Sequence, residues 1–147
     1  VQVPPEILNH PGALSQSQLA LIRRHPDAGA RMLLQVPAVP RLAVIVAYEH
    51  HLQADGGGYP VVPSGWVIHR ASALTHVADV YDALRTHRPY RRARTHDQIV
   101  ELMWRDRGTV FPEALLHVFL DEVAPMIDTG AETPAPLPAS ELGAAAI

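Results

Sequence analysis

Three histidines and one aspartate are the residues of this sequence best suited to bind a metal. Each falls at an expected helix end or beside an apolar helical stripe: His25, His50, His51 and Asp79. Neutral imidazoles and carboxylates suit divalent cations such as iron, manganese or zinc. Adjacent histidines at a helix end point about 100° apart, so one can face the bundle and the other the following loop. Taken singly, each histidine is better explained as a surface or satisfied core residue, and spacing alone does not establish a metal site.

A glycine-rich segment shortly after the paired histidines is a candidate ligand-binding loop. Residues 55–60 read DGGGYP. Glycines such as Gly56 and Gly58 permit positive φ and a close approach of ligand to main chain. The ring of Tyr59 offers a flat face on which a base can stack. The alternative is an ordinary turn-rich connection, in which glycine triplets are common.

Charged residues near residue 82 offer a possible phosphate-binding arrangement. Asp82 lies three residues after Asp79, so the two share one face of an expected helix. Four arginines follow this helix: Arg88, Arg91, Arg92 and Arg94. Guanidinium groups grip phosphate oxygens through paired hydrogen bonds. The simpler interpretation of the run is a solvated basic patch.

Composition narrows the class of protein. A chain of 147 residues has the size of one domain, and 48% hydrophobic residues suit a globular protein. A formal charge of −3 gives no electrostatic case for DNA or RNA binding. The absence of cysteine excludes disulfides and thiolate metal sites, and suits a cytoplasmic protein. We expect no membrane segment, because no apolar run approaches roughly 18 residues. Six histidines have no supporting context and are interpreted as structural or surface residues: His10, His69, His76, His87, His96 and His117.

Apolar spacing and the prolines predict an all-α bundle with one long glycine-rich loop. The prolines near the start favour an extended segment over residues 1–11. Helices are expected at 15–24, 27–34, 40–51, 68–86, 96–105 and 112–123, with a loop over 53–65. Ser15 is the expected N-cap of the first helix. The domain is expected to span 1–125, and the Ala- and Pro-rich stretch 126–147 to be a disordered tail or linker.

Three apolar stripes place the candidate site against the core of this bundle. The first places His50 inward: Val39, Leu42, Ala43, Val46, Ala47 and His50. The second is the expected buried side of the helix that carries Asp79: Leu74, Val77, Ala78 and Tyr81. The third lies on the last helix: Leu115, Leu116, Phe119, Leu120 and Val123.

Motifs in this order resemble those of the HD-GYP family, a branch of the HD superfamily that hydrolyses cyclic di-GMP. HPDAG at 25–29 resembles the family's H-P-x-x-G, and HHLQADGGGYP at 50–60 resembles H-H-x-x-x-D-G-x-G-Y-P. VADVYDAL at 77–84 with RPYR at 88–91 resembles V-A-D-x-x-D-A-L followed by R-P-Y-R/K. PEILN at 5–9 and GTVF at 108–111 resemble the first and last family motifs. The likeness covers residues 1 to about 123.

The resemblance implies an HD-type helical domain around two or three divalent ions, commonly iron or manganese. The metal ligands it implies are His25, His50, His51 and Asp79. Asp79 and Asp82 would be catalytic, with Asp82 holding ligand or water near the metals. The substrate-binding residues would be Asp82, Arg88 and Arg91 on the phosphates and Gly56, Gly58 and Tyr59 on the guanine side. The substrate would be cyclic di-GMP, and the product the linear dinucleotide or GMP.

The family's His-Asp pair aligns upstream of Val1, so the resemblance implies that the ligands bridging the metals precede this stretch. Three hypotheses stay open. The first is a cyclic di-GMP phosphodiesterase domain, inactive where the His-Asp pair is missing. The second is a non-catalytic regulatory module that contacts protein partners such as signalling domains. The third is an HD phosphohydrolase acting on another nucleotide.

Overall fold

Helices dominate the part of the chain that the structure describes. The computed structural model describes residues 3–87 and 92–127, and within these ranges only two isolated β-bridges accompany the helices. The elements are α1 (Pro5–Leu8), α2 (Gln16–Ile22), α3 (His25–Leu34), α4 (Arg41–Glu49), α5 (Arg70–Arg85), α6 (His96–Arg105), α7 (Glu113–Val118), the π-helical segment η1 (Phe119–Val123) and α8 (Ala124–Ile127). The all-α prediction is confirmed. Arg88, Arg91 and nearly all of the expected tail lie outside the described residues.

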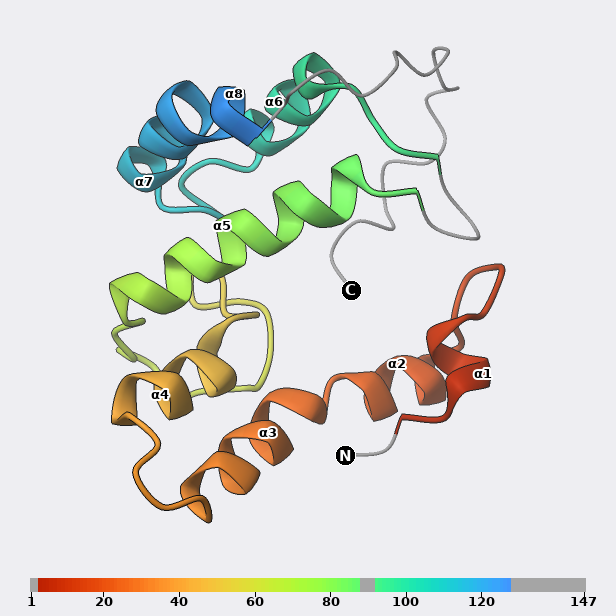
Figure 1. Ribbon diagram of the computed structural model, residues 1–147, viewed down its shortest axis with the longest axis vertical. Coiled ribbons are helices and arrows are strands. Elements are labelled where there is room, and N and C mark those ends of the chain that lie inside the picture. Colours follow the sequence, from red (N-terminus) through yellow and green to blue (C-terminus); the bar gives the residue numbers. More distant parts are fainter. Residues whose placement is uncertain (1–2, 88–91, 128–147) are drawn as a thin grey trace.

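The helices form two groups with α5 between them. Figure 1 shows α1 to α4 on one side of α5, and α6 to α8 on the other. The glycine-rich loop and the segment after it connect α4 to α5, in yellow in the same view. Among the described residues, no helix has both the length and the apolar character to cross a bilayer.

The first helix overturns the expectation of an extended N-terminal segment. Pro5 occupies the first turn of α1, where the N–H that proline lacks would have no helical partner anyway. The N–H of Leu8 donates to the Pro4 carbonyl at 3.2 Å, and that of Asn9 to the Pro5 carbonyl at 2.9 Å. Proline therefore starts this short helix.

Local capping sets the boundary between α2 and α3. The Oγ of Ser15 accepts from the Gln18 N–H at 3.3 Å, and Gln18 Oε1 accepts from the Ser15 N–H at 2.8 Å. This reciprocal pair is a capping box, and it confirms Ser15 as the N-cap. A break between the first two predicted helices is present, but it lies at residues 23–24 and not at the His25-Pro26 dipeptide, since α2 ends at Ile22 and α3 already begins at His25.

The main core lies between α5 and the elements that follow it. Its members are Val77, Tyr81, Leu84, Ile99, Met103, Phe111, Leu116, Phe119, Leu120 and Ala124. Leu42 and Leu74, expected to be buried, are exposed. The buried face of α5 instead includes Ser72 and His76, two polar residues that hydrogen-bond to the end of α4.

The last predicted helix contains one π-helical turn. Phe119 and Leu120 are buried as expected, but the next buried position is Ala124 and not Val123, which is exposed. A π turn spans one more residue than an α turn, so the stripe moves on by one position.

Candidate metal centre

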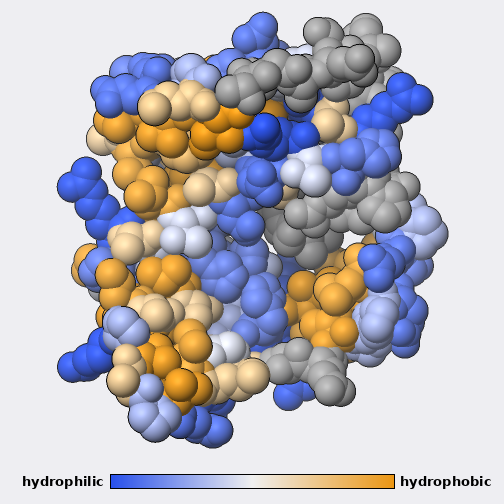
Figure 2. All heavy atoms as spheres, viewed as in Figure 1, coloured by the Kyte–Doolittle hydropathy of each residue, from blue (hydrophilic) through white to orange (hydrophobic). Residues whose placement is uncertain are grey.

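Three imidazoles converge where α3 packs beside α4. His25 begins α3, His50 caps the end of α4 and His51 follows it. One ring nitrogen from each lies within 4.8 Å of the others, and the Nε2 atoms of His25 and His50 are 2.9 Å apart. Of the described residues, these three are the group able to share one metal ion. Figure 2 shows polar side chains gathered at the centre of this face of the molecule.

Backbone carbonyls fix the proton positions on two of these rings. Nδ1 of His25 lies 2.9 Å from the Ile22 carbonyl oxygen, and Nδ1 of His50 lies 3.0 Å from that of Ala47. A carbonyl oxygen can only accept, so each Nδ1 must carry the hydrogen. On neutral rings both Nε2 atoms then present lone pairs to each other. This contact is repulsive unless a cation lies between them.

Burial keeps the rings of His50 and His51 in their neutral form. Burial, followed by the positive charge that His25 can carry, lowers the pKa of His50. The same two effects, with the charge of His50 and His76, lower the pKa of His51 to about 3. Both rings are therefore neutral at pH 7, which is the form that binds metal. A ring held through Nδ1–H to a carbonyl, with Nε2 free, is the usual arrangement of a metal-binding histidine.

The two aspartates lie on the exposed side of α5. Asp79 is close enough for its negative charge to act on His50, His76 and Tyr59. It is not among the groups whose ligand atoms lie within 4.8 Å of one another. Asp82 lies about one turn further along the same helix. The structure thus brings Asp79 near the histidines without joining it to them.

The glycine-rich loop folds back onto the paired histidines. The N–H of Tyr59 donates to the His51 carbonyl at 3.1 Å, and that of Gln53 to the Gly57 carbonyl at 3.0 Å. Gly58 has φ +82°, and a β-carbon there would collide with the His51 carbonyl oxygen. This position requires glycine for both reasons. Gly56 also has positive φ, +86°, but open space surrounds it.

Tyr59 covers the histidine cluster. Its ring stacks on His51 with centroids 4.4 Å apart, and meets the ring of His25 edge-on at 6.1 Å. The guanidinium of Arg23 lies over the same ring, 5.7 Å from its centroid. The hydroxyl is buried without a partner among the described residues, and burial raises its pKa to about 12. The ring expected on the guanine side is therefore already engaged by protein groups.

Glu49 is a buried acid that sequence reasoning missed. Its carboxylate accepts from Trp66 Nε1 at 3.0 Å, the His69 N–H at 2.9 Å and Ser72 Oγ at 2.7 Å. These bonds tie the start of α5 to the residue that precedes His50. A lone acid in the apolar stretch 42–49 was the available signal.

His76, interpreted from the sequence as a structural or surface residue, is buried next to the cluster. It is 6% exposed, and its Nδ1 lies 2.9 Å from the His50 carbonyl oxygen, to which it must donate. Its ring packs on Phe111 at 5.5 Å and meets His51 edge-on at 6.3 Å. Nε2 is buried with no partner among the described residues. His76 therefore supports the cluster from within the bundle.

Comparison with known proteins settles the family. The HD domain family matches residues 1–115. The chain belongs to it. Within the HD domain family, the motifs expected of the HD-GYP branch are confirmed by similarity to curated cyclic di-GMP phosphodiesterases.

One of these HD-GYP relatives, from Pseudomonas aeruginosa, is 39% identical over 111 residues, which cover 76% of this chain and 27% of that protein. A cyclic di-GMP phosphodiesterase response regulator from Xanthomonas campestris is 31% identical over a stretch that covers 82% of this chain and 32% of its own length. A 3′3′-cGAMP-specific phosphodiesterase of Vibrio cholerae is 32% identical over 82% of this chain and 23% of its own length. The chain thus spans between about a quarter and a third of these relatives. The HD family is metal-dependent, and the lone pairs of the cluster fit a divalent ion.

Proposed function

We propose that this chain contributes the metal-binding face of a phosphodiesterase that hydrolyses cyclic di-GMP to the linear dinucleotide or GMP. The observation that carries the proposal is the pair of Nε2 atoms 2.9 Å apart, each on a ring whose Nδ1–H is held by a carbonyl. Cyclic di-GMP is the proposed substrate because these relatives are named as cyclic di-GMP phosphodiesterases. Iron or manganese is the proposed metal, since both accept mixed imidazole and carboxylate ligands.

Different residues of the chain would hold the metal, orient substrate or water, and contact the phosphates. His25, His50 and His51 would hold metal, and Asp79 would add a carboxylate from α5. Divalent ions bound there would polarise the phosphodiester and activate water for in-line attack. Asp82 would orient substrate or water, and Arg88 and Arg91 would contact phosphate oxygens. Gly56, Gly58 and Tyr59 would shape the wall nearest the base.

Hydrolysis by the natural full-length protein tests this proposal. The protein, purified without oxygen, is incubated with cyclic di-GMP and the nucleotides are separated by chromatography. We expect the linear dinucleotide or GMP to appear, and a His50→Ala variant to lose activity with its metal. A metal-free protein that leaves cyclic di-GMP intact would refute the enzyme and favour the non-catalytic regulatory module.

A second cyclic dinucleotide is a specific alternative substrate. The 3′3′-cGAMP-specific relative is about as similar to this chain as the response regulator, at 32% against 31% identity. Competition between the two dinucleotides in one reaction gives the ratio of kcat/KM values directly. If kcat/KM for cyclic di-GMP exceeds that for 3′3′-cGAMP, the main proposal is supported. If it is lower, the alternative is supported.

A further inference from the structure

A cleft beside the histidine cluster is lined by two arginines. It has a volume of about 750 Å³ and lies between the α2–α3 junction and residues 58–61. Arg23, Arg24 and Asp27 line one wall, and Tyr59 and Pro60 line the other. A volume of this size is in the usual range for small-molecule sites.

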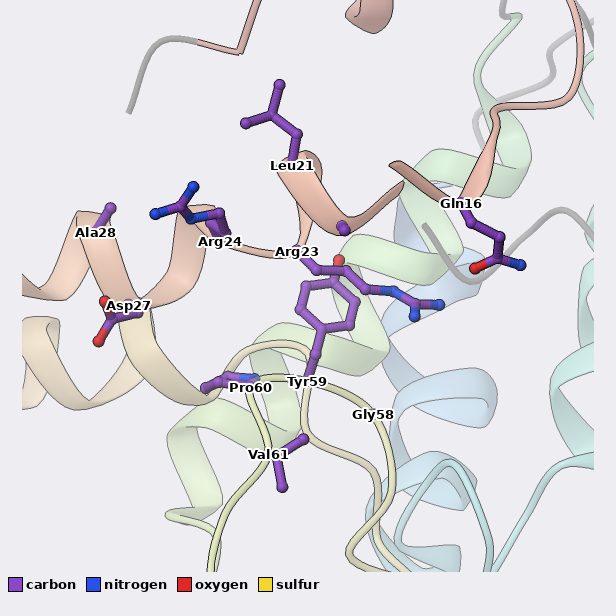
Figure 3. A pocket seen from close by; sticks show the side chains of 11 residues that line it. Gln16, Leu21, Arg23, Arg24, Asp27, Ala28, Gly58, Tyr59, Pro60 and Val61 are labelled. Atoms are coloured by element: carbon purple, nitrogen blue, oxygen red, sulfur yellow. The ribbon is translucent and has the colours of Figure 1, made fainter. Parts of the chain in front are cut away.

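Arg23 links this cleft to the cluster. Figure 3 shows its side chain extending across the ring of Tyr59, whereas Arg24 points away from that ring. The guanidinium lies 5.7 Å from the Tyr59 centroid, and Tyr59 stacks on His51 at 4.4 Å. One aromatic ring therefore separates a permanent positive charge from a proposed metal ligand.

The charge of Arg23 is not neutralised by an acid in the described part of the chain. None of the ion pairs found there includes Arg23 or Arg24. Asp27, the acid lining the cleft, pairs with Arg31 on its own helix at 2.8 Å. An arginine resting on an aromatic face and lacking a carboxylate is well suited to bind phosphate.

We propose that Arg23 binds the phosphate of a cyclic dinucleotide that is not being cleaved. The inference rests on the proposed function, in which the other phosphate lies at the histidine cluster. A cyclic dinucleotide carries two phosphodiesters in one ring, so a second phosphate must lie near the first. The cleft next to Tyr59 provides both the space and the uncompensated positive charge for it.

The test compares two substrates in the natural full-length protein. Cyclic di-GMP has a second phosphate, whereas bis(p-nitrophenyl) phosphate has a single phosphodiester. Arg23→Ala should raise KM for cyclic di-GMP by about tenfold or more, the usual effect of losing a hydrogen bond to a charged group. Kinetics with the chromogenic ester and the metal content should stay the same. Arg23→Lys should fall between wild type and Arg23→Ala.

Arg24→Ala is the matched control, because it removes the same charge from the next residue, whose side chain points away from Tyr59. Its KM for cyclic di-GMP should change by less than about threefold, in line with a partly screened charge. The inference is overturned if Arg23→Ala leaves KM unchanged, matches Arg24→Ala, or impairs both substrates equally.

Failure of the proposed function gives a different pattern. In that case the wild-type protein hydrolyses neither substrate, and calorimetric titration with cyclic di-GMP decides the role of Arg23. Binding that weakens in Arg23→Ala but not in Arg24→Ala supports the inference. Equal binding by all variants, or no binding by the wild type, overturns it.

Discussion

Replacing Glu49 should destabilise the fold more than any surface substitution, because three donors converge on its carboxylate. The three donors differ in access to water. Trp66 is 44% exposed, and His69, whose backbone N–H is the donor, is also an exposed residue, but Ser72 is 0% exposed. In Glu49→Ala, the Ser72 hydroxyl stays buried without a partner, at a cost of about 1–3 kcal/mol. Loss of the two other charged hydrogen bonds adds about 1 kcal/mol in total after water replaces them.

The expected loss for Glu49→Ala is therefore about 2–4 kcal/mol in the free energy of unfolding. Urea denaturation followed by circular dichroism measures it. Ser72→Ala should cost less, because it removes the buried hydroxyl instead of stranding it. The double variant should lose less than the sum of the two single losses, since both changes act on one hydrogen bond. A loss below about 0.5 kcal/mol for Glu49→Ala, within the range of surface substitutions, would refute the reasoning.

Three further predictions follow from the loop, the buried histidine and the titration of the cluster. Gly58→Ala should destabilise the domain by about 2 kcal/mol or more and reduce metal occupancy. Gly56→Ala should cost only about 1 kcal/mol. Both glycines have positive φ, but only at Gly58 would the new β-carbon collide with a carbonyl oxygen. Equal losses in urea denaturation would contradict this. His76→Leu should cost about 1–3 kcal/mol by leaving the His50 carbonyl without its donor, and no loss would show that this hydrogen bond is unimportant. The metal-free protein should lose stability as the pH falls from about 6.5 towards 3. In the folded state the pKa of His51 is lowered to about 3, whereas in the unfolded state it is about 6.5, so over this range the unfolded state binds a proton that the folded state does not. His51→Asn should flatten this profile, and an unchanged profile would show that His51 is not the group responsible.

Local patterns explain which parts of the fold were predictable. The expected helix at 96–105 is confirmed because Thr95 caps it and Gln98 completes the capping box, both short-range features. The π turn in η1 was not predictable, since its apolar residues also fit an uninterrupted helix. The starting α1 was missed because prolines within a first turn look the same in sequence as prolines in an extended segment.

The candidate site also has a part that was predictable from the sequence and a part that was not. His25, His50 and His51 were predicted together, and the structure brings them together through the packing of α3 on α4. The contacts of Glu49 and His76 with the site were not predicted, because their partners lie 17 to 26 residues away in the sequence. Only tertiary packing reveals that a lone acid in an apolar helix has three donors, or that a histidine donates to the carbonyl of another.

The metal content of the protein tests the central claim most directly. Elemental analysis of the natural full-length protein, purified without oxygen, should find at least about one iron or manganese ion per chain. His50→Ala should lose most of it, because one of the two facing Nε2 lone pairs is removed. His117→Ala, at an exposed histidine on α7, should retain it. Metal content that is negligible in the wild type, or unchanged in His50→Ala, would contradict the assignment of this cluster as a metal centre.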